Sequence, residues 1–509
     1  MRKLLHNFAD NYKRNRRDVI KLTIIILLGS FLRLFNFPYR YGLGEETVRD
    51  AVVGIEAARE LQLPLTGAFS SLGPFTFGPL YTYQVAFSYL VLPFNYSPWI
   101  YLSLISIFYI YIIYKIGEIL NGKNFGLILA FIAAISPAQI ISATHLTSHN
   151  NTNIFVALTI WIFLKIFKKN ISYWWGFFLG VSLGFGMNLH YQMTGLFILV
   201  ILLLFYKPKR YLYFITSIVG IFVTFIPLFI FELNNHWFNV RNMIYYAMYG
   251  KNLMYVPNRW LFYVRDFWPA FWADALGVPL IGGYISIVIV SVIFLAVLKK
   301  RKLTAPFLAL IICFIFNFIL LRYYWGHRFF GYLNFLRPFV FILTGFALLY
   351  LFQIKQYGKY IGSILFIFLT LFAVPRIKDS IIKDPFTMQM YKEVAILKNK
   401  FPSKKITVYK CTKKYISGSN TEPFSFAFLL DKDRLLTKSG VNIGFIGTKE
   451  NNCISSRNEL SKNILEIKDT NLLDLSHISK NSLVKDGWEI IDFKYIYDLN
   501  ARWWFREQP

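Results

Sequence analysis

Two carboxylates stand four residues apart in the polar stretch that follows the first long apolar segment. Glu46 and Asp50 would project from one face of a helix, and Glu45 stands beside Glu46. Neighbouring carboxylates near a low-dielectric boundary can have separated pKa values, which leaves one of them ready to accept a proton. The spacing therefore predicts a general base. The competing interpretation is an amphipathic surface helix in which Glu46 pairs with Arg49 and the other charges are solvated.

Histidines gather at the ends of apolar segments that the topology described below places on one side of a membrane. Titratable groups at one membrane face are what a reaction site needs. His145 and His149 are four residues apart, a spacing that suits a metal ion or simply the polar end of a helix. The sequence lacks the spacing of a closed zinc site, so no metal site is predicted and a divalent cation is left open as a cofactor. The five histidines are His145, His149, His190, His236 and His327.

The composition is that of a membrane protein. Of 509 residues, 56% are hydrophobic and 19% aromatic, and the mean hydropathy is +0.44. Apolar stretches of roughly 17–22 residues recur, each long enough to cross the hydrocarbon core of a bilayer. The predicted spans are 19–36, 99–120, 125–143, 151–167, 171–189, 192–206, 211–231, 277–298, 303–321, 336–353 and 360–374.

The formal net charge of +28 does not indicate nucleic-acid binding. The cations stand mostly in short loops between apolar spans, as in KPKR at 207–210 and KKRK at 299–302, and in the C-terminal tail. This distribution favours anionic lipid headgroups and the positive-inside rule, whereas nucleic acid requires a continuous basic surface. We expect membrane lipids as partners and no nucleic acid.

The basic loops can share the inner side only if the apolar segment 79–96 does not cross fully. Prolines bracket that segment, which favours a re-entrant or surface helix. Parity then gives about eleven crossings, an inner N-terminus and outer loops at 37–98 and 232–276. The predicted fold is mostly α, a polytopic domain over residues 1–375. Residues 376–509 are more polar and predict a small extracytoplasmic α/β domain, with strands at ITVY (406–409) and VNIGFI (441–446).

Two further features bear on structure. Gly176, Gly180 and Gly184 recur every four residues and predict the close approach of another helix. Cys313 lies within an apolar span and predicts packing. Cys411 and Cys453 lie in the tail, where they either pair in an oxidising compartment or remain free.

Several segments together resemble a known class of enzyme. The arginine of FLRL (31–34), the acidic loop, and GPLYTY (78–83) are followed in order by SPAQIISATHLTSHNNTNIF, GMNLHYQ, IPLFIFELNNHWFNVRN and GYLNFLRPF. This series, over residues ~20–350, is similar to the lipid-dependent glycosyltransferases of the GT-C class. Within that class it resembles glycosyltransferase family 39, the protein O-mannosyltransferase and aminoarabinose transferase type. The tail is less characteristic.

The resemblance implies a reaction and a base. A sugar on polyprenyl phosphate would be transferred with inversion to an acceptor hydroxyl that a loop carboxylate deprotonates. The gapless match places Glu46 at the position of the base, where the family has Asp, and an alternative register places Glu45 there. Asp50 matches a second acid of the family's loop and is the other candidate, because the longer Glu side chain moves the carboxylate.

The leaving phosphate would need cations, since negative charge develops on it in the transition state. Arg328 and His327 are the preferred pair, and the other candidates are Arg241, Arg259, Arg265 and Arg322. Candidate substrate ligands are His190, Gln192, His145 and Asn151.

Two other functions compete with this interpretation. A flippase or transporter for lipid-linked glycans would need polar residues along a path through the bilayer, but mid-span charges are nearly absent here. An oligosaccharyltransferase would need an acidic metal site and a Trp-Trp-Asp motif, whereas Phe follows Trp503-Trp504. The prediction is thus a multi-pass enzyme of the plasma membrane, acting at its outer face on a glycan, lipid or protein acceptor.

Overall fold

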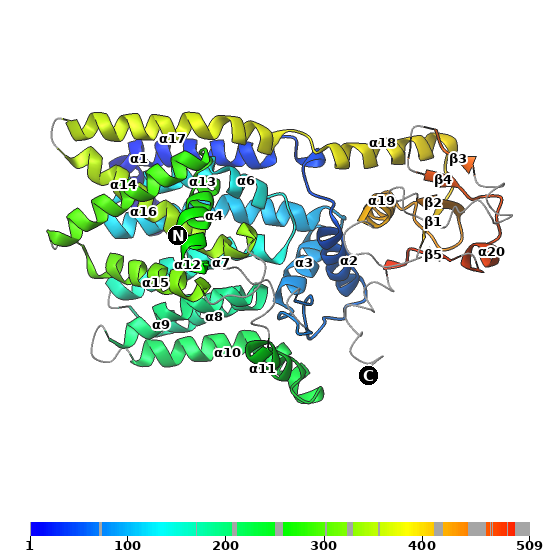
Figure 1. The fold of residues 1–509 in the computed structure, drawn as a ribbon, viewed down its shortest axis with the longest axis horizontal. Helices are drawn as coiled ribbons and strands as arrows, with labels where there is room; N and C mark the ends of the chain where they lie inside the picture. Colours follow the sequence, from blue (N-terminus) through cyan, green and yellow to red (C-terminus); the bar gives the residue numbers. More distant parts are fainter. Residues whose placement is uncertain are drawn as a thin grey trace.

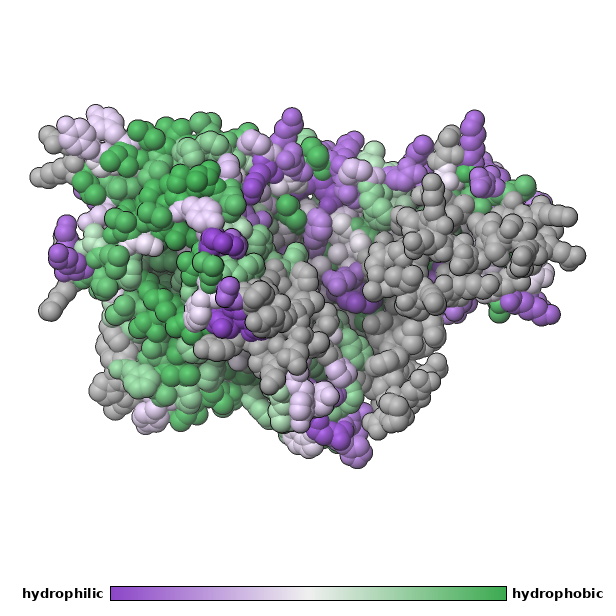
Figure 2. Space-filling view, in the orientation of Figure 1, coloured by the Kyte–Doolittle hydropathy of each residue, from purple (hydrophilic) through white to green (hydrophobic). Residues whose placement is uncertain are grey.

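The fold was analysed in a computed structural model of the chain. It describes residues 2–70, 74–168, 171–205, 211–249, 258–300, 303–322, 329–354, 357–411, 421–445, 465–468, 470, 472–485 and 487–493. Long helices form one end of the molecule and a small sheet forms the other (Figure 1). In the space-filling view, hydrophobic residues cover much of the helical end and hydrophilic ones gather toward the sheet (Figure 2).

Within the described residues, 7 helical segments are long and apolar enough to cross a membrane. The protein is therefore a multi-pass membrane protein, as predicted. The segments are α4 (Ser97–Asn121), α7 (Ser148–Lys168), α10 (Tyr211–Asn234), α14 (Leu280–Lys299), α15 (Ala305–Arg322), η5 (Phe330–Leu336) with α16 (Arg337–Gln353), and α17 (Tyr357–Ile381) with its continuation α18 (Pro385–Lys400).

Of the other predicted spans, 19–36 falls largely in the long helix α1 (Arg2–Leu34), which has 33 residues, and the rest are shorter or broken helices. Residues 125–143 divide at Ser136, because Pro137 keeps the residue before it out of the helical conformation. Ser136 then caps the new helix by accepting a hydrogen bond from the Gln139 amide. These shorter elements are α5 (Lys123–Ile135), α6 (Pro137–Ser142), α8 (Trp174–Leu189), η2 (Tyr191–Leu196) and α9 (Phe197–Leu204).

The loop 37–98 folds into short helices beside the helical body. It holds η1 (Phe37–Tyr39), α2 (Glu45–Arg59) and α3 (Leu80–Val91). At 12 residues α3 is about 18 Å long, too short to cross a bilayer. It packs against α2, where a Cβ at Gly54 would lie 2.5 Å from Cβ of Val85. The loop 232–276 likewise forms α11 (Phe238–Tyr249), α12 (Arg259–Leu261), the π-helical turn η4 (Phe262–Phe267) and α13 (Trp268–Leu276).

The C-terminal region contains a five-stranded sheet with strand order β3-β4-β2-β1-β5. Both predicted strands are confirmed: they form the parallel pair β1 (Ile406–Cys411) and β2 (Val441–Phe445), with Ile406 opposite Val441. The other elements are α19 (Thr421–Lys432), β3 (Leu465–Glu466), β4 (Leu472–Asp474), α20 (Lys480–Lys485) and β5 (Trp488–Ile490). The question of a Cys411–Cys453 bond lies outside the described residues.

Helix α19 of this region contacts α2 of the loop 37–98. Ser425 Oγ donates a hydrogen bond to the Leu43 carbonyl, next to the start of α2. At the other end of α2, Arg59 Nη2 lies 3.0 Å from Asp431 Oδ2, which also accepts from Asn95 Nδ2 at 2.9 Å. Two segments almost 400 residues apart in the chain thus fix one another.

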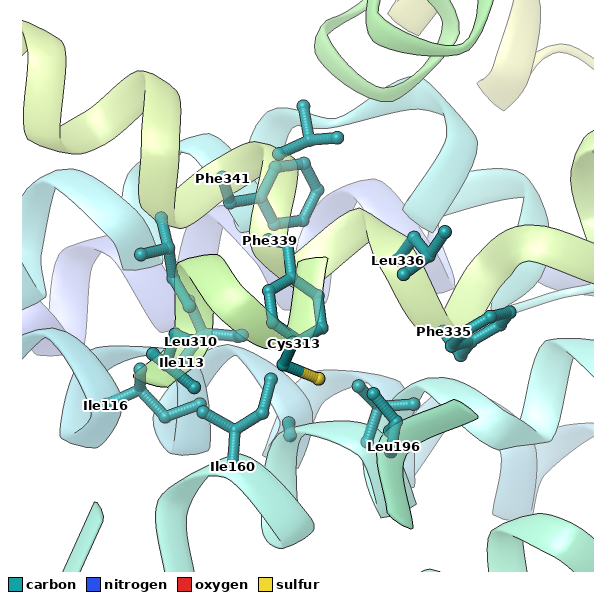
Figure 3. Close-up of a cluster of buried hydrophobic side chains, with 14 of the residues drawn as sticks. Ile113, Ile116, Ile160, Leu196, Leu310, Cys313, Phe335, Leu336, Phe339 and Phe341 are labelled. Carbon is teal, nitrogen blue, oxygen red and sulfur yellow. The ribbon is translucent and has the colours of Figure 1, made fainter. Parts of the chain in front are cut away.

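The main hydrophobic cluster lies among the long helices, and Figure 3 shows part of it. Cys313 is fully buried there beside Phe339 and Leu310, which confirms that it packs in the core. The glycine row of α8 faces α10, as predicted. A Cβ at Gly180 would lie 1.9 Å from the Ser217 carbonyl oxygen, so the two backbones touch at that point.

We predict that Gly180→Ala destabilises the protein by about 1–3 kcal/mol, because the added methyl group must push the α10 backbone aside. Thermal unfolding in detergent should show a lower transition temperature. Phe178→Leu, on an exposed position of the same helix, is the matched control and should leave the transition nearly unchanged. Equal transition temperatures for all three proteins would contradict the close helix contact.

Candidate active site

A pocket of about 340 Å³ opens beside α2 and brings several predicted site residues together. Its walls come from α2, from residues 68–77, from the N-terminal end of α7, from the turn after α8, and from α11 and η5. We call it the carboxylate pocket. Its lining residues are Glu46, Arg49, Asp50, Ala68, Phe69, Ser70, Phe75, Phe77, Thr147, Ser148, His149, His190, Tyr191, Gln192, Met243, Tyr246 and Tyr332.

The carboxylates reach the pocket because both lie in the first turns of α2, which begins at Glu45. Its first turn is fixed by Thr47, whose Oγ1 donates to the Gly42 and Gly44 carbonyls at 2.7 Å each. Glu46 and Asp50 both line the pocket, as expected from their i, i+4 spacing. The side chain of Glu45 lies outside the described part of the structure.

The ion pair in the pocket differs from the one that the surface-helix interpretation supposes. Arg49 donates two hydrogen bonds to one carboxylate oxygen of Asp50, from Nε at 3.0 Å and from Nη2 at 2.8 Å. The side chain of Glu46 is exposed. Burial raises the pKa of Asp50. The Arg49 charge and its hydrogen bond oppose this shift, and the negative charge of Glu46 adds to it. Asp50 is thus a carboxylate with increased proton affinity at the pocket wall.

Aromatic rings hold two histidines that also line the pocket. His190 stacks with Phe77 at 5.3 Å and with Tyr332 at 5.0 Å between ring centroids, and His149 meets Tyr332 edge-on at 5.7 Å. Burial lowers the pKa of His190 to about 4, so its imidazole is neutral at neutral pH. Neither His190 Nδ1 nor the side-chain amide of Gln192 has a hydrogen-bond partner among the described residues. Both are therefore available to a polar ligand.

Residues 67–70 pair with residues 74–77 in antiparallel fashion, and the position of this paired segment depends on the junction of α10 and α11. Phe77 and Gly67 are joined by a backbone hydrogen bond of 2.9 Å. The loop is held by Tyr191, whose hydroxyl donates to the Thr76 carbonyl at 2.6 Å, and by Asn239, whose Oδ1 accepts from the Thr76 amide at 2.7 Å. Within the matching motif IPLFIFELNNHWFNVRN, Asn239 is thus a positioning residue for the pocket wall.

Two of the predicted substrate ligands lie away from this pocket. His145 and His149 are not on one helix, because residues 143–147 form the turn before α7 begins at Ser148. His145 consequently lines a different pocket. Asn151 is buried one turn into α7, where its amide donates to Gln84 Oε1 at 2.8 Å.

The described arginines predicted to bind phosphate do not line the carboxylate pocket either. Arg322 lies over the Trp260 ring, 5.6 Å from its centroid, and Arg265 pairs with Asp266 on the surface. Arg241 is exposed on α11, and Arg259 lies at the start of α12. The preferred pair, His327 and Arg328, lies outside the described residues.

Sequence reasoning missed Arg49 and Tyr332 as parts of the site. The sequence predicts Arg49 only as a partner for Glu46, although its position between two carboxylates on α2 indicates that it could also bind Asp50. Tyr332 gave no signal of its own, since it reaches the pocket through the fold of η5. Within the described residues, no group of three or more His, Cys, Asp and Glu side chains is arranged to hold a metal ion.

Residues 77–237 match the family model described as dolichyl-phosphate-mannose-protein mannosyltransferase. This range carries much of the pocket lining, including both histidines. A comparison with curated protein sequences finds no match.

Among solved structures, the chain matches ArnT from Cupriavidus metallidurans over 84% of its own length. For the apo structure of ArnT, the TM-score is 0.55, the identity is 12% and 92% of the ArnT chain is covered. For the structure of ArnT bound to undecaprenyl phosphate, the TM-score is 0.56, the identity is 12% and 93% of the ArnT chain is covered. It also matches the oligosaccharyltransferase AglB from Archaeoglobus fulgidus, in complex with an inhibitory peptide and a dolichol-phosphate. There the TM-score is 0.50 and the identity 12%, with 77% of this chain and 59% of that chain covered.

These identities show the fold, and the family model adds the class of enzyme over about a third of the chain. Together they confirm the resemblance found in the sequence: the chain has the GT-C fold, and residues 77–237 are similar to a family of mannosyltransferases.

We predict that Asn239→Ala loosens the loop at 67–77, because the Thr76 amide then loses its partner in a buried place. An unsatisfied buried amide costs about 1–3 kcal/mol. Hydrogen–deuterium exchange should become faster in peptides that cover residues 67–78. Asn235→Ala is the control, since the Asn235 side-chain amide, just beyond α10, donates to the Phe231 carbonyl of that helix. Unchanged exchange in Asn239→Ala would show that the loop does not depend on α11.

Proposed function

We propose that this chain transfers a sugar from a polyprenyl-phosphate-linked donor to an acceptor hydroxyl, with inversion, at the outer face of the membrane. The observation that carries the proposal is the carboxylate pocket. It joins Glu46 and Asp50 to neutral His190 and to Gln192 within walls of aromatic rings. Carboxylates supply a base, and rings with nearby amides suit the apolar faces and hydroxyl groups of a sugar.

The reaction follows from these groups. A carboxylate takes the proton of the acceptor hydroxyl, and the oxygen attacks the anomeric carbon of the donor sugar. The new C–O bond forms as the bond from that carbon to the phosphate oxygen breaks, so polyprenyl phosphate leaves with the electron pair. Attack opposite the leaving group inverts the anomeric centre. Each step requires positioning and charge stabilisation but no covalent enzyme intermediate.

Glu46 and Asp50 differ in exposure, and we assign them different roles. Glu46 is the exposed carboxylate and is the one that the family register places as base. Asp50 has the raised pKa, which matches a proton acceptor better to neutral pH, but its bond to Arg49 restricts it. We propose Glu46 as the base, with Asp50 and Arg49 setting the charge around it.

Support for the donor class comes from two related folds. ArnT is known bound to undecaprenyl phosphate and AglB bound to a dolichol-phosphate, both polyprenyl-type phosphates. Among the described residues that line the pocket, Arg49 is the permanent cation. His327 and Arg328 remain our prediction for further contacts to the leaving phosphate. Membrane lipids and a glycan, lipid or protein acceptor would be the partners.

The carboxylates are tested by Glu46→Gln and Asp50→Asn. We expect loss of the base to lower the transfer rate by about 10²–10⁴-fold, with smaller loss for the other residue. The assay is transfer from radiolabelled polyprenyl-phosphate sugars by purified protein. Glu60→Gln, at the far end of α2 and outside the pocket, should retain activity. Transfer that survives both pocket substitutions would exclude the proposed base.

The pH dependence is tested through Arg49. Asp50, whose pKa is raised, loses its charge as the pH falls; the charge around the proposed base Glu46 then changes, so activity should fall on the acidic side. Because Arg49 lowers the pKa of Asp50, Arg49→Gln should move this acidic limb of kcat/KM to higher pH. Arg59→Gln, which breaks the pair with Glu56 instead, should leave the limb in place. An unmoved limb in Arg49→Gln would show that Asp50 does not influence the reaction.

A further inference from the structure

A second charged pocket lies at the C-terminal end of α17. It has a volume of about 450 Å³ and shares no lining residue with the carboxylate pocket. Arg40, which follows η1, forms one wall, and Arg376 and Lys383 stand at the end of α17 and just beyond it. We call it the α17 pocket. Nothing in the proposed transfer reaction uses it.

Arg40 is the buried cation of this pocket, with 3% of its surface exposed. Its Nη1 donates to carbonyls at the end of α1, at 3.0 Å to Leu32 and 2.7 Å to Phe35. Its Nε and Nη2 have no partner among the described residues. These two nitrogens form one edge of the guanidinium. The equivalent edge of Arg49 donates its hydrogen bonds to Asp50. A buried edge of this kind is suited to two oxygens of one anion.

The carboxylates in the wall do not fill that role. Asp274 is engaged by Arg337 at 3.0 Å, and Asp384 Oδ2 caps α18 by accepting from the Thr387 amide at 2.9 Å. Asp379 is exposed. The buried donors of Arg40 therefore remain for a ligand, and Arg376 and Lys383 add two exposed positive charges to the lining of the pocket.

The same pocket has an apolar margin. Ile141 and Ile382 both line it and are 43% and 52% exposed. On α17, exposed apolar residues such as Leu371 precede the charged residues from Arg376 onward. This change marks where a spanning helix leaves the hydrocarbon core, the depth at which lipid phosphates lie. In Figure 1 the end of α17 lies at the boundary between the long helices and the sheet region.

We propose that the α17 pocket binds the phosphate group of a membrane lipid, with the Nε–Nη2 edge of Arg40 on two phosphate oxygens. Arg376 and Lys383 attract the charge, and the apolar margin contacts the first part of the lipid chain. Bilayer phospholipids and polyprenyl phosphate share this chemistry. The site is separate from the one at which sugar transfer is proposed and does not depend on it.

Native mass spectrometry of the purified protein tests this proposal. The protein would be titrated separately with a phosphatidylglycerol, with undecaprenyl phosphate, with inorganic phosphate and with a diacylglycerol of matched chains. We expect wild type to retain at least one of the two lipid phosphates, which identifies the source. The double variant Arg376→Gln/Lys383→Gln should retain it about tenfold less, since each lost charge weakens a charge-assisted contact.

Lys378→Gln is the matched control, because Lys378 is exposed on the same helix but does not line the pocket. It should retain lipid like wild type. Arg40→Gln should abolish retention, and the double variant at exposed positions keeps the test valid if Arg40→Gln does not fold. Equal retention by the double variant, equal retention of diacylglycerol, or binding of inorganic phosphate alone would each overturn the proposal.

Discussion

The high free energy of a charge in the hydrocarbon core of a bilayer restricts where this protein can hold its charged side chains. An ionised carboxylate is costly in the bilayer core, and the chain carries Glu46 and Asp50 on α2, in a loop beside the spans. There Asp50 is buried enough for its pKa to rise, and Arg49 limits the rise. Helix α3 contacts α2 and also α4 and α8, and it thereby connects this short helix to the body of long helices.

Much of the fold was predictable because it follows from periodicity and length. Apolar runs of spanning length, the glycine row at 176–184 and the two central strands gave strong signals. The break at Ser136 was not predicted, because the run 125–143 is mostly apolar and its few exceptions, Ser136, Pro137, Gln139 and Ser142, do not lower its hydropathy enough to divide it. A run of hydrophobic residues reports burial in lipid or protein alike, so it does not say where one helix stops.

The site was predictable only where the chain is locally regular. The i, i+4 rule placed Glu46 and Asp50 correctly because α2 is a helix, and it failed for His145 and His149 because a turn lies between them. Arg322 and Arg265 are further examples, because their charge is evident from the sequence but their contacts are not. Arg322 lies over the Trp260 ring, and Arg265 pairs with Asp266. Contacts between distant segments, such as Asn239 with Thr76, have no local signature at all.

The contact between α19 and α2 also has a consequence for biosynthesis. Leu43 and Ser425 meet, so the beginning of α2 finds one of its supports only after most of the polypeptide has left the ribosome. While the long helices insert into the bilayer and assemble, α2 would lack that support. The start of α2 would then reach its final packing only once α19 has folded against it.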